Sequence, residues 1–330
     1  MKIAIPHIKE IKDKLFLVTG GAGFIGSNLV SYLLHNGAKE VRVLDNLSTG
    51  SKDNVKEFEK NPSFQFILGD ITNYQACFEA CYQVDGVFHN AALGSVSRSL
   101  EDPIATNHAN VTGFVTMLTA AKNQQVKRFI YASSSSVYGD DMSAEKQEHI
   151  TGNLLSPYAV SKKTNELYAA IFHKSYNIEI IGLRYFNVFG PKQNPNGQYA
   201  AVIPIFIAHV LNNKTPFIFG DGTTSRDFTY IDNVVYANVL AMTTKNPDAI
   251  NEVYNVAYGS SSSLNTLFEL IKKQLHSTIP AIYKPERKGD IKNSLANINK
   301  AKNRLEYEPL INIEQGLKLA IDWYKNNAPQ

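Results

Sequence analysis

The sequence predicts an α/β fold in which a doubly wound parallel sheet is covered by helices on both faces. Short apolar runs alternate with segments of helical spacing from residue 14 to residue 184. Polar motifs follow several of these runs, as they do where ligands bind at the carboxyl ends of parallel strands. The pattern is less regular after residue 190, and we expect a smaller α/β domain there.

Composition limits the kinds of partner. The chain of 330 residues is 44% hydrophobic and 19% charged, with a net charge of +3 and without a basic run that interleaves aromatics, so nucleic acid is a poor candidate. The longest apolar run, 200–211, contains Pro204 and is shorter than the ~20 residues of a membrane span. Residues 1–14 lack the apolar centre of a signal peptide. We therefore expect a cytoplasmic protein that acts on small molecules, with neither nucleic acid nor membrane as partner.

The two cysteines, Cys77 and Cys81, lie four residues apart in a segment that we expect to be helical. A disulfide at this spacing would strain the helix, and no His or Cys cluster stands nearby to complete a metal site. We expect buried or half-buried thiols and no metal.

The alternation begins with a strand, a tight turn and a helix. Residues 14–19 form an apolar run, and residues 27–34 have helical spacing. Between them, Gly20, Gly23 and Gly26 let the backbone turn sharply and approach a pyrophosphate, whose charge is met by free N–H groups at the helix N-terminus. This segment predicts a dinucleotide site.

The next predicted strand, 40–44, ends at Asp45, 25 positions after Gly20. A carboxylate at this point accepts a hydrogen bond from a ribose hydroxyl and repels a 2′-phosphate. Asp45 therefore favours NAD over NADP as the cofactor, and the alternative is an ordinary solvated acid in a loop.

The alternation then continues along the chain. We expect further strands at 64–70, 86–90, 127–133 and 178–184, and helices at 74–82, 103–122 and 158–176. Strands separated by helices pair in parallel through right-handed crossovers, which gives the doubly wound sheet.

A reactive pair stands at the start of helix 158–176. Pro157 suits the first turn of a helix and Ser156 caps it, so Tyr158 and Lys162 share a helical face. Lowering the tyrosine pKa from ~10 by ~3 units takes roughly 4 kcal/mol, which a cation ~4 Å away supplies at an effective dielectric of about 20. The pair predicts a tyrosine base activated by a lysine. With 17 tyrosines in the chain, an ordinary helix surface is the alternative, and the other motifs decide between the two.

Further motifs occur in the order of a known family: Gly20-x-x-Gly23-x-x-Gly26, Asp45-Asn46-Leu47, Gly69-Asp70-Ile71, His89-Asn90-Ala91-Ala92, Asn110-Val111-x-Gly113, the serine run 133–136, Tyr158-x-x-x-Lys162 and Leu183-Arg184-Tyr185-Phe186-Asn187. The chain resembles the extended short-chain dehydrogenases/reductases, and within them the 4-epimerases of UDP-sugars, from about Lys14 to the C-terminal helix. The resemblance implies an NAD-binding Rossmann domain at 14–190 with a returning segment around 228–257. It also implies a nucleotide-sugar-binding domain mainly at 191–330, after an N-terminal extension at 1–13.

The resemblance also implies roles for single residues. Tyr158 is expected to be the base, Lys162 its activator, and Ser134 the partner of the reacting hydroxyl. NAD is expected to contact Gly20, Gly23, Phe24, Ile25, Gly26, Asp45, Asn46, Asp70, Ile71, Ala91, Ala92, Asn110, Ser133, Tyr158, Lys162 and Tyr185. The UDP-sugar is expected to contact Gly94, Ser95, Ser134, Ser136, Tyr158, Asn187, Val202, Phe217, Arg226, Arg287, Asp290 and Ser294.

Two arginines of the second half, Arg226 and Arg287, suit bidentate contacts to a diphosphate. The resemblance points to the same two residues and places Asp290 near a ribose. Surface salt bridges are the alternative. Phe217 and Phe228 either line a pocket for the base or belong to the core, and the sequence leaves this open.

The implied reaction begins when NAD takes a hydride from C4 of the sugar while Tyr158 removes the hydroxyl proton. The 4-keto intermediate then turns and receives the hydride on its other face. Dehydratases of this superfamily carry acidic residues beside the active-site serine, whereas Ser135 and Ser136 stand there in this chain. Another NAD-dependent enzyme that modifies nucleotide sugars, and a dinucleotide-sensing regulator without catalysis, are the alternatives. Retention of Ser134, Tyr158 and Lys162 together argues against the regulator.

Ser294 bears on the choice of sugar. The resemblance places it at the wall that faces the C2 substituent, where family members restricted to glucose and galactose have a tyrosine. Gly94, Ser95 and Arg98 resemble a loop of epimerases that prefer acetylated sugars. We therefore expect UDP-N-acetylglucosamine and UDP-N-acetylgalactosamine as the main pair, with uronic-acid forms as the alternative.

The family also pairs two protomers, and a homodimer is expected through helices 103–122 and 158–176. Val111, Phe114, Val115 and Leu118 face either that interface or the sheet.

Overall fold

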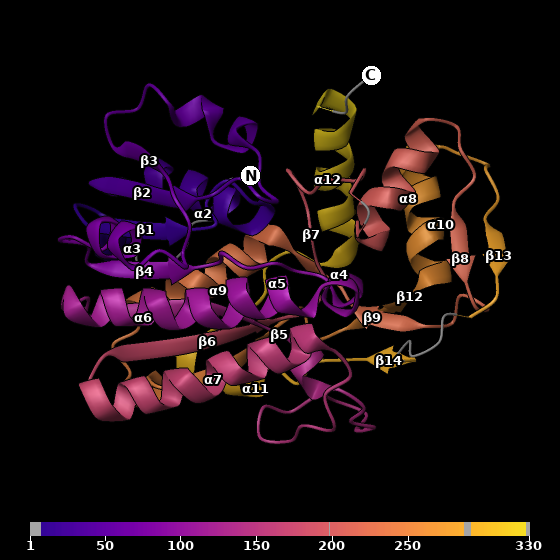
Figure 1. Ribbon diagram of the computed structural model, residues 1–330. Helices are drawn as coiled ribbons and strands as arrows, with labels where there is room; N and C mark the ends of the chain where they lie inside the picture. Colours follow the sequence, from indigo (N-terminus) through magenta and orange to yellow (C-terminus); the bar gives the residue numbers. More distant parts are fainter. Residues whose placement is uncertain (1–7, 198, 287–291, 328–330) are drawn as a thin grey trace.

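The computed structural model describes residues 8–197, 199–286 and 292–327. Its centre is a sheet of seven parallel strands in the order β11-β6-β5-β4-β1-β2-β3, with helices on both faces (Figure 1). The strands are β1 Leu15–Thr19, β2 Glu40–Asp45, β3 Phe64–Leu68, β4 Gly86–His89, β5 Arg128–Ser134, β6 Glu179–Tyr185 and β11 Glu252–Val256. The predicted doubly wound α/β sheet is confirmed.

The six strands that the sequence predicts all begin within one residue of the expected run. A parallel strand covered on both faces is almost wholly apolar, so its limits are visible in the sequence. Every residue of β1 is buried, for example, and so is every residue of β4.

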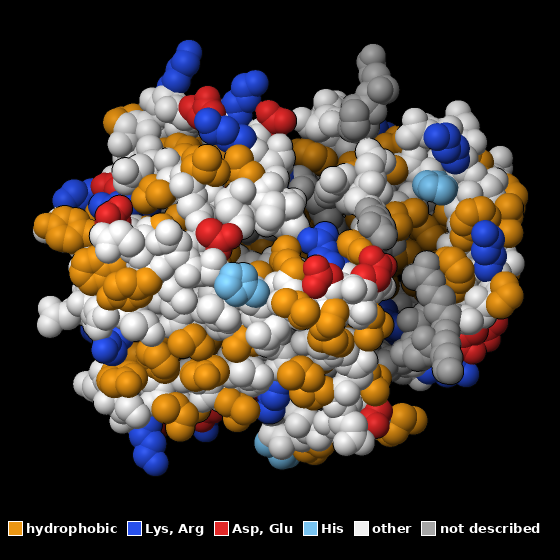
Figure 2. Space-filling view, in the orientation of Figure 1, with side chains coloured by type: hydrophobic (Ala, Val, Ile, Leu, Met, Phe, Trp, Pro, Cys, Tyr) orange, Lys and Arg blue, Asp and Glu red, His pale blue; other side chains and the backbone are white. Residues whose placement is uncertain are grey.

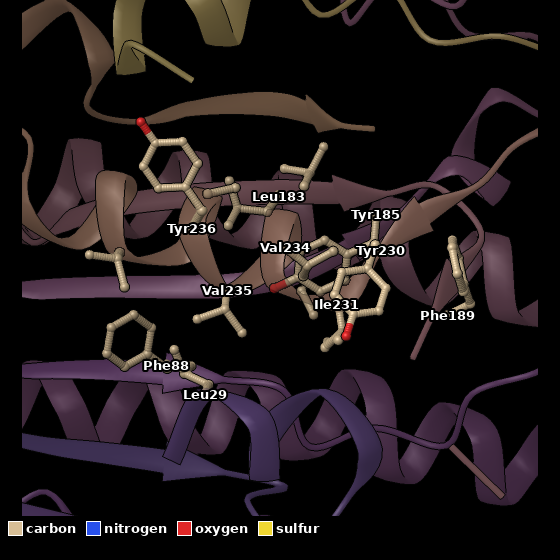
Figure 3. Close-up of a cluster of buried hydrophobic side chains, with 14 of the residues drawn as sticks. Leu29, Phe88, Leu183, Tyr185, Phe189, Tyr230, Ile231, Val234, Val235 and Tyr236 are labelled. Atoms are coloured by element: carbon tan, nitrogen blue, oxygen red, sulfur yellow. The ribbon is translucent and has the colours of Figure 1, made fainter. Parts of the chain in front are cut away.

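Two helices, α2 Phe24–His35 and α9 Ile231–Thr243, pack against one face of the sheet. Figure 3 shows the side chains of this core, where Val234 of α9 lies near Leu183 of β6, and Leu29 of α2 lies near Phe88 of β4. Almost all of α9 is buried. In the described parts of the chain, no helix has both the length and the apolar composition of a membrane span.

The opposite face is covered by α3 Tyr74–Ala80, α6 Gly113–Asn123 and α7 Pro157–Tyr176, and α5 Pro103–Asn107 packs against α7. Phe114 and Leu118 of α6 are buried against the sheet, whereas Val111 and Val115 are half-exposed. The structure thus separates the apolar residues of this helix into a core face and an outer face.

The predicted helix 103–122 is not one regular α-helix. A π turn, η3 His108–Thr112, separates α5 from α6, and a further helix, α4 Val96–Glu101, precedes them. Asn110 lies in the π turn and binds both backbone groups of Leu93, whose N–H is 2.7 Å from Oδ1 and whose C=O is 3.0 Å from Nδ2. The turn is therefore held against the loop after β4, which apolar spacing does not reveal.

Both cysteines are buried and reduced, as expected. Burial raises the pKa of the Cys77 thiol and of the Cys81 thiol to about 12. They are packing residues of the core beneath α3.

The smaller part of the chain lies beside the carboxyl ends of the strands, to the right in Figure 1. Its elements are β7 Val188–Phe189, α8 Val202–Leu211, β8 Phe217–Phe219, β9 Ser225–Asp227, β10 Thr229–Tyr230, β12 Ser261–Ser263, α10 Leu264–Leu275, β13 Ile282–Lys284, β14 Asn293–Ser294 and α12 Ile313–Asn327. Helix α11 Asn299–Leu305 instead packs against β11 and α9 of the main sheet. The remaining short helices are α1 Ile8–Ile11, η1 Lys52–Asn54, η2 Lys56–Phe58, η4 Ser135–Tyr138 and η5 Pro247–Ala249. The strands here have two or three residues each, so pairing between distant segments holds them in place.

Asp227 is the centre of one such set of contacts. Its carboxylate is fully buried and accepts hydrogen bonds from the backbone N–H groups of Tyr258, Gly259 and Ala296 at 3.1, 3.0 and 3.4 Å. These bonds join β9 to the segment before β12 and to the segment after β14.

Candidate active site

Glycines allow the tight turn between β1 and α2 and its close packing against the first turn of the helix. Gly20 has a φ of +68°, and its carbonyl oxygen accepts a hydrogen bond of 3.0 Å from the N–H of Gly23. A Cβ atom at Gly26 would lie 2.2 Å from that same oxygen, which is an impossible contact. Gly23 caps α2 without a side chain, so N–H groups of the first turn are left for an anionic ligand.

Asp45, at the end of β2, fixes this turn. One carboxylate oxygen accepts a bond of 2.9 Å from the N–H of Ala22, and the other accepts a bond of 2.8 Å from the N–H of Leu47. A carboxylate oxygen accepts more than one hydrogen bond, so Asp45 keeps acceptor capacity for a ribose hydroxyl.

A cavity lies at the carboxyl ends of β1 to β4. Its lining includes eleven of the residues expected to contact the cofactor: Gly20, Gly23, Phe24, Ile25, Gly26, Asp45, Asn46, Asp70, Ile71, Ala91 and Ala92. The cavity is also lined by Ser48, Thr49 and Gly50 in the loop after β2 and by His108 and Ala109 in the π turn. Sequence reasoning missed these five residues. The small polar residues after Asp45 could have indicated the first three from the sequence, whereas the π turn has no sequence pattern that indicates the other two.

Asp70 completes the polar rim of this cavity. Burial opposes its ionisation, but hydrogen bonds from Thr72 and Asn46 hold the pKa of its carboxyl below the ordinary value. The cradle of glycines, the helix N-terminus and Asp45 together fit a dinucleotide with an unphosphorylated ribose, which is NAD.

A second cavity continues from the first. Four residues line both cavities: Ile25, Asn90, Ala92 and Gly94. The second cavity is also lined by Ala132, Ser133, Ser134, Tyr158, Lys162, Tyr185, Asn187 and Val188. The structure therefore brings the expected catalytic residues together beside the expected cofactor pocket.

Tyr158 and Lys162 lie where the sequence predicts, on the first turns of α7. Ser156 caps this helix by accepting a bond of 3.1 Å from the N–H of Ala159, with Pro157 in the first position. The Lys162 Nζ atom lies 5.9 Å from the centre of the Tyr158 ring and donates a bond of 2.8 Å to the carbonyl oxygen of Ala132.

Burial acts against the charged forms of both members of this pair. Burial raises the pKa of Tyr158 above its ordinary value, and only the hydrogen bond with Ser134 opposes the shift. The Lys162 ammonium bonds to Ala132 rather than to the phenol, so its expected lowering of the Tyr158 pKa stays a prediction. Burial lowers the pKa of Lys162 itself to about 8.

Ser134 stands at the junction of β5 and η4. Its Oγ atom accepts a bond of 3.1 Å from the N–H of Ser136 and hydrogen-bonds the Tyr158 side chain. The Oγ atom of Ser136 is buried and has no partner among the residues that the structure describes. Ser134 lines the second cavity, whereas Ser136 lines neither of the two cavities, and its contact with the sugar stays a prediction.

Three expected cofactor residues already have partners within the protein. Asn110 donates to Ser161 at 3.1 Å in addition to its contacts with Leu93. The hydroxyl of Tyr185 accepts a bond of 2.9 Å from Asn238. The Ser133 hydroxyl donates a bond of 2.7 Å to the carboxylate of Glu166. Contact of these three side chains with NAD stays a prediction.

The loop after β4 carries Gly94 and Ser95. Ser95 has a φ of +95° and caps α4 by accepting a bond of 3.3 Å from the N–H of Arg98. Arg98 stacks on the ring of Tyr199, 5.0 Å from its centre. This loop therefore reaches from the second cavity to the segment before α8.

The two phenylalanines considered for the base pocket, Phe217 and Phe228, differ in burial. Phe217 on β8 is half-exposed beneath the Lys284 ammonium, which lies 3.5 Å from its ring centre, whereas Phe228 is buried in the core. Phe228 is thus a packing residue, and Phe217 stays a candidate for contact with the base. Val202 lies at the first position of α8 and is half-exposed.

Arg226 and Ser294 lie side by side on paired strands, β9 and β14. Arg226 donates to the carbonyl oxygen of Ser225 at 2.9 Å. Asn187, at the rim of the second cavity, donates to the carbonyl oxygen of Asp227 at 3.1 Å. Arg287 and Asp290, which were expected to contact diphosphate and ribose, lie outside the described residues.

Comparison with known proteins agrees with this geometry. Residues 16–257 match the NAD dependent epimerase/dehydratase family. A UDP-N-acetylglucosamine 4-epimerase from Methanobrevibacter ruminantium, solved with UDP-N-acetylmuramic acid, is 40% identical, with a TM-score of 0.90 over 96% of this chain and 99% of that one. A UDP-glucose 4-epimerase from Thermotoga maritima, solved with UDP-glucose, is 36% identical, with a TM-score of 0.88 over 94% of this chain and 99% of that one.

A third similar structure is a UDP-glucuronic acid 4-epimerase from Bacillus cereus, solved with UDP-glucuronic acid and NAD. It is 34% identical, with a TM-score of 0.87 over 94% of this chain and 99% of that one. The chain belongs to the NAD dependent epimerase/dehydratase family, as an enzyme of its UDP-sugar 4-epimerase type with NAD as the cofactor.

Proposed function

We propose that the protein inverts C4 of UDP-N-acetylhexosamines, interconverting UDP-N-acetylglucosamine and UDP-N-acetylgalactosamine, and that UDP-glucose and UDP-galactose are weaker substrates. One observation carries the proposal: Ser134, Tyr158 and Lys162 line a cavity that is continuous with the glycine-lined pocket. A reacting sugar in this cavity is within reach of both a proton acceptor and the cofactor.

In this proposal, Tyr158 removes the proton of the C4 hydroxyl and later returns it to the opposite face. When bound, NAD supplies the acceptor and then the donor of the C4 hydride, so the cycle has no net redox change. Ser134 hydrogen-bonds the reacting oxygen and Tyr158 together. Lys162 supplies the positive charge that favours the phenolate, and its bond to Ala132 holds it in place.

Two observations support the acetylated sugars. Ser294 is a small side chain beside Arg226, which we propose as a diphosphate ligand together with Arg287. The epimerase from Methanobrevibacter ruminantium, to which this chain is similar, is named for UDP-N-acetylglucosamine. In the same proposal, the part of the chain around 191–330 binds the nucleotide sugar, while 14–190 and a segment around 228–257 bind NAD.

We also propose a homodimer. Exposed apolar side chains gather on α4, α5 and α7, and Figure 2 shows hydrophobic side chains across the region where Figure 1 draws α6 and α7. The members of this α7 patch are Leu100, Ile104, Val160, Leu167, Tyr168 and Ile171, which are 40 to 81% exposed. Contiguous apolar surface of this kind is typical of a protein interface, and a second copy of α7 is complementary to it in an isologous dimer.

Incubation of the purified protein with a panel of UDP-sugars, followed by NMR, tests the proposal. We expect inversion at C4 of the acetylated pair without added cofactor, because the returned hydride regenerates the cofactor. Inversion of UDP-glucuronic acid or its acetylated relatives alone would assign a uronic-acid epimerase instead. Release of CO2, or a 4-keto-6-deoxy sugar as the main product, would contradict epimerisation. Absence of any turnover would favour the regulator.

A further inference from the structure

We propose that Glu166 is a positioning residue, which fixes the end of β5 to α7 and so sets the placement of Ser134 relative to Tyr158. The inference rests on 4-epimerisation, as proposed above, and holds for any UDP-sugar. Glu166 is 7% exposed and lies one turn beyond Lys162, in neither of the two cavities described above.

The Glu166 carboxylate binds three side chains. Its Oε1 atom accepts a hydrogen bond of 2.7 Å from the Ser133 hydroxyl and one of 2.8 Å from Nε of Arg184. Its Oε2 atom accepts a hydrogen bond of 2.8 Å from Nη2 of Arg184 and one of 3.3 Å from Nζ of Lys163. Ser133 immediately precedes Ser134, and it is the register partner of Arg184 between β5 and β6. The carboxylate thus links α7 to the adjacent strands β5 and β6.

The contact with Ser133 is one of three between successive turns of α7 and the end of β5. Tyr158 hydrogen-bonds Ser134, Lys162 bonds to the carbonyl of Ala132, and Glu166 bonds to Ser133. Tyr158, Lys162 and Glu166 are spaced four residues apart, so they form one row on the inner face of the helix. In this proposal, the contact between Glu166 and Ser133 holds Ser134 in place relative to Tyr158.

Arg184 holds the Glu166 carboxylate in a fixed position. Its side chain is 2% exposed, donates to the carbonyl oxygen of Glu148 at 3.1 Å, and lies 4.9 Å from the centre of the Tyr138 ring. Tyr138 in turn donates to Asn255 at 2.6 Å. Glu166 is therefore held at two atoms by a guanidinium that cannot move without disturbing η4 and β11.

Displacement of Ser134 relative to Tyr158 should lower the catalytic rate more than substrate binding. A misplacement of about 1 Å between reacting groups can cost about 10²-fold in rate, whereas binding of the nucleotide occurs elsewhere in the cleft. In Glu166→Gln, the new amide N–H₂ faces donors on Arg184 and Lys163, so the side chain must turn away. We expect kcat to fall by about 10²-fold, while KM and the affinity for UDP measured by calorimetry change by less than about threefold.

Ser133→Ala is the second variant, since it removes one hydrogen bond and leaves the Glu166–Arg184 pair in place. We expect it to fold like the wild type and to lower kcat by about 3- to 10-fold at unchanged KM. This variant keeps the inference testable if Glu166→Gln fails to fold.

Glu179→Gln is the matched control. Glu179 binds Arg128 at 2.6 Å on the same two strands, but at their opposite ends. This variant should lower the melting temperature and leave kcat within about twofold. Wild-type kcat in both Ser133→Ala and Glu166→Gln would overturn the inference, as would an equal loss of kcat in Glu179→Gln. A wild type that turns over UDP-glucose but neither acetylated sugar would contradict the proposed substrate and leave this test intact.

Discussion

The ammonium of Lys162 donates a hydrogen bond of 2.8 Å to the carbonyl oxygen of Ala132. Ala132 lies two residues before Ser134 on β5, so the cation is fixed to the strand that carries the serine rather than to the phenol of Tyr158. The Nζ atom still lies within 5.9 Å of the phenol ring. In the proposed mechanism the lysine acts on Tyr158 through its charge, so this effect depends on the protonation state of Lys162.

The first prediction concerns pH. Burial lowers the pKa of Lys162 to about 8, so its ammonium is present below that pH and is lost as the pH rises through 8. Loss of the cation disfavours the phenolate of Tyr158. We expect log(kcat/KM) to decrease above pH 8 with a slope approaching −1, as measured by initial rates across the pH range with one UDP-sugar.

Lys162→Arg separates this effect from other titrations, because arginine keeps its charge throughout the accessible pH range. The variant should have a lower maximal rate, since a longer side chain enters a buried position, but no decrease near pH 8. A decrease that persists unchanged in Lys162→Arg would assign the titration to another group.

The second prediction concerns the base. Tyr158→Phe removes one hydroxyl and little volume, so the cavity and the nucleotide site should persist. We expect turnover to fall by about 10²- to 10⁴-fold, with the affinity for UDP unchanged in calorimetry. Full activity of this variant would show that another group accepts the proton.

The strands of the sheet could be predicted closely because buried parallel strands have sequences that are apolar runs between turn residues. The smaller part could not, since strands such as β14 Asn293–Ser294 are too short for any periodicity and depend on pairing with β9. The π turn at His108–Thr112 was likewise hidden, because its signal is the bond between Asn110 and Leu93 rather than an apolar pattern.

The candidate site follows the same division. Glycines at 20, 23 and 26 and the pair Tyr158 and Lys162 are local motifs, and the structure places all of them on the two cavities. Burial raises the pKa of Tyr158, and neither this burial nor the bond between Lys162 and Ala132 is visible in the local motif. Glu166 was missed because its partners come from β5 and β6.

The third prediction concerns assembly. Leu167 and Ile171 are 60% and 58% exposed on the outer face of α7, opposite the row that carries Tyr158. A glutamate at either position would place an uncompensated charge in the proposed interface. We expect Leu167→Glu and Ile171→Glu to lower the mass in light scattering from that of a dimer to that of a monomer.

Leu310→Glu is the control for this prediction, because Leu310 is 46% exposed before α12 and outside the α7 patch. It should leave the mass unchanged. A wild type that is monomeric at micromolar concentration would reject the homodimer, and a dimer in both α7 variants would place the interface elsewhere.

The last prediction concerns Ser294 and the sugar. Ser294 is half-buried on β14 and pairs with Arg226 on β9, so a larger side chain here enters the space beside a proposed diphosphate ligand. Ser294→Tyr should abolish turnover of the acetylated pair and spare UDP-glucose and UDP-galactose, because overpacking penalises the larger C2 substituent. Asn293→Tyr adds the same bulk one residue earlier, where the side chain of a strand points to the opposite face, and should preserve the wild-type preference. Equal relative rates on the two sugar classes in Ser294→Tyr and the wild type would place the selective wall elsewhere.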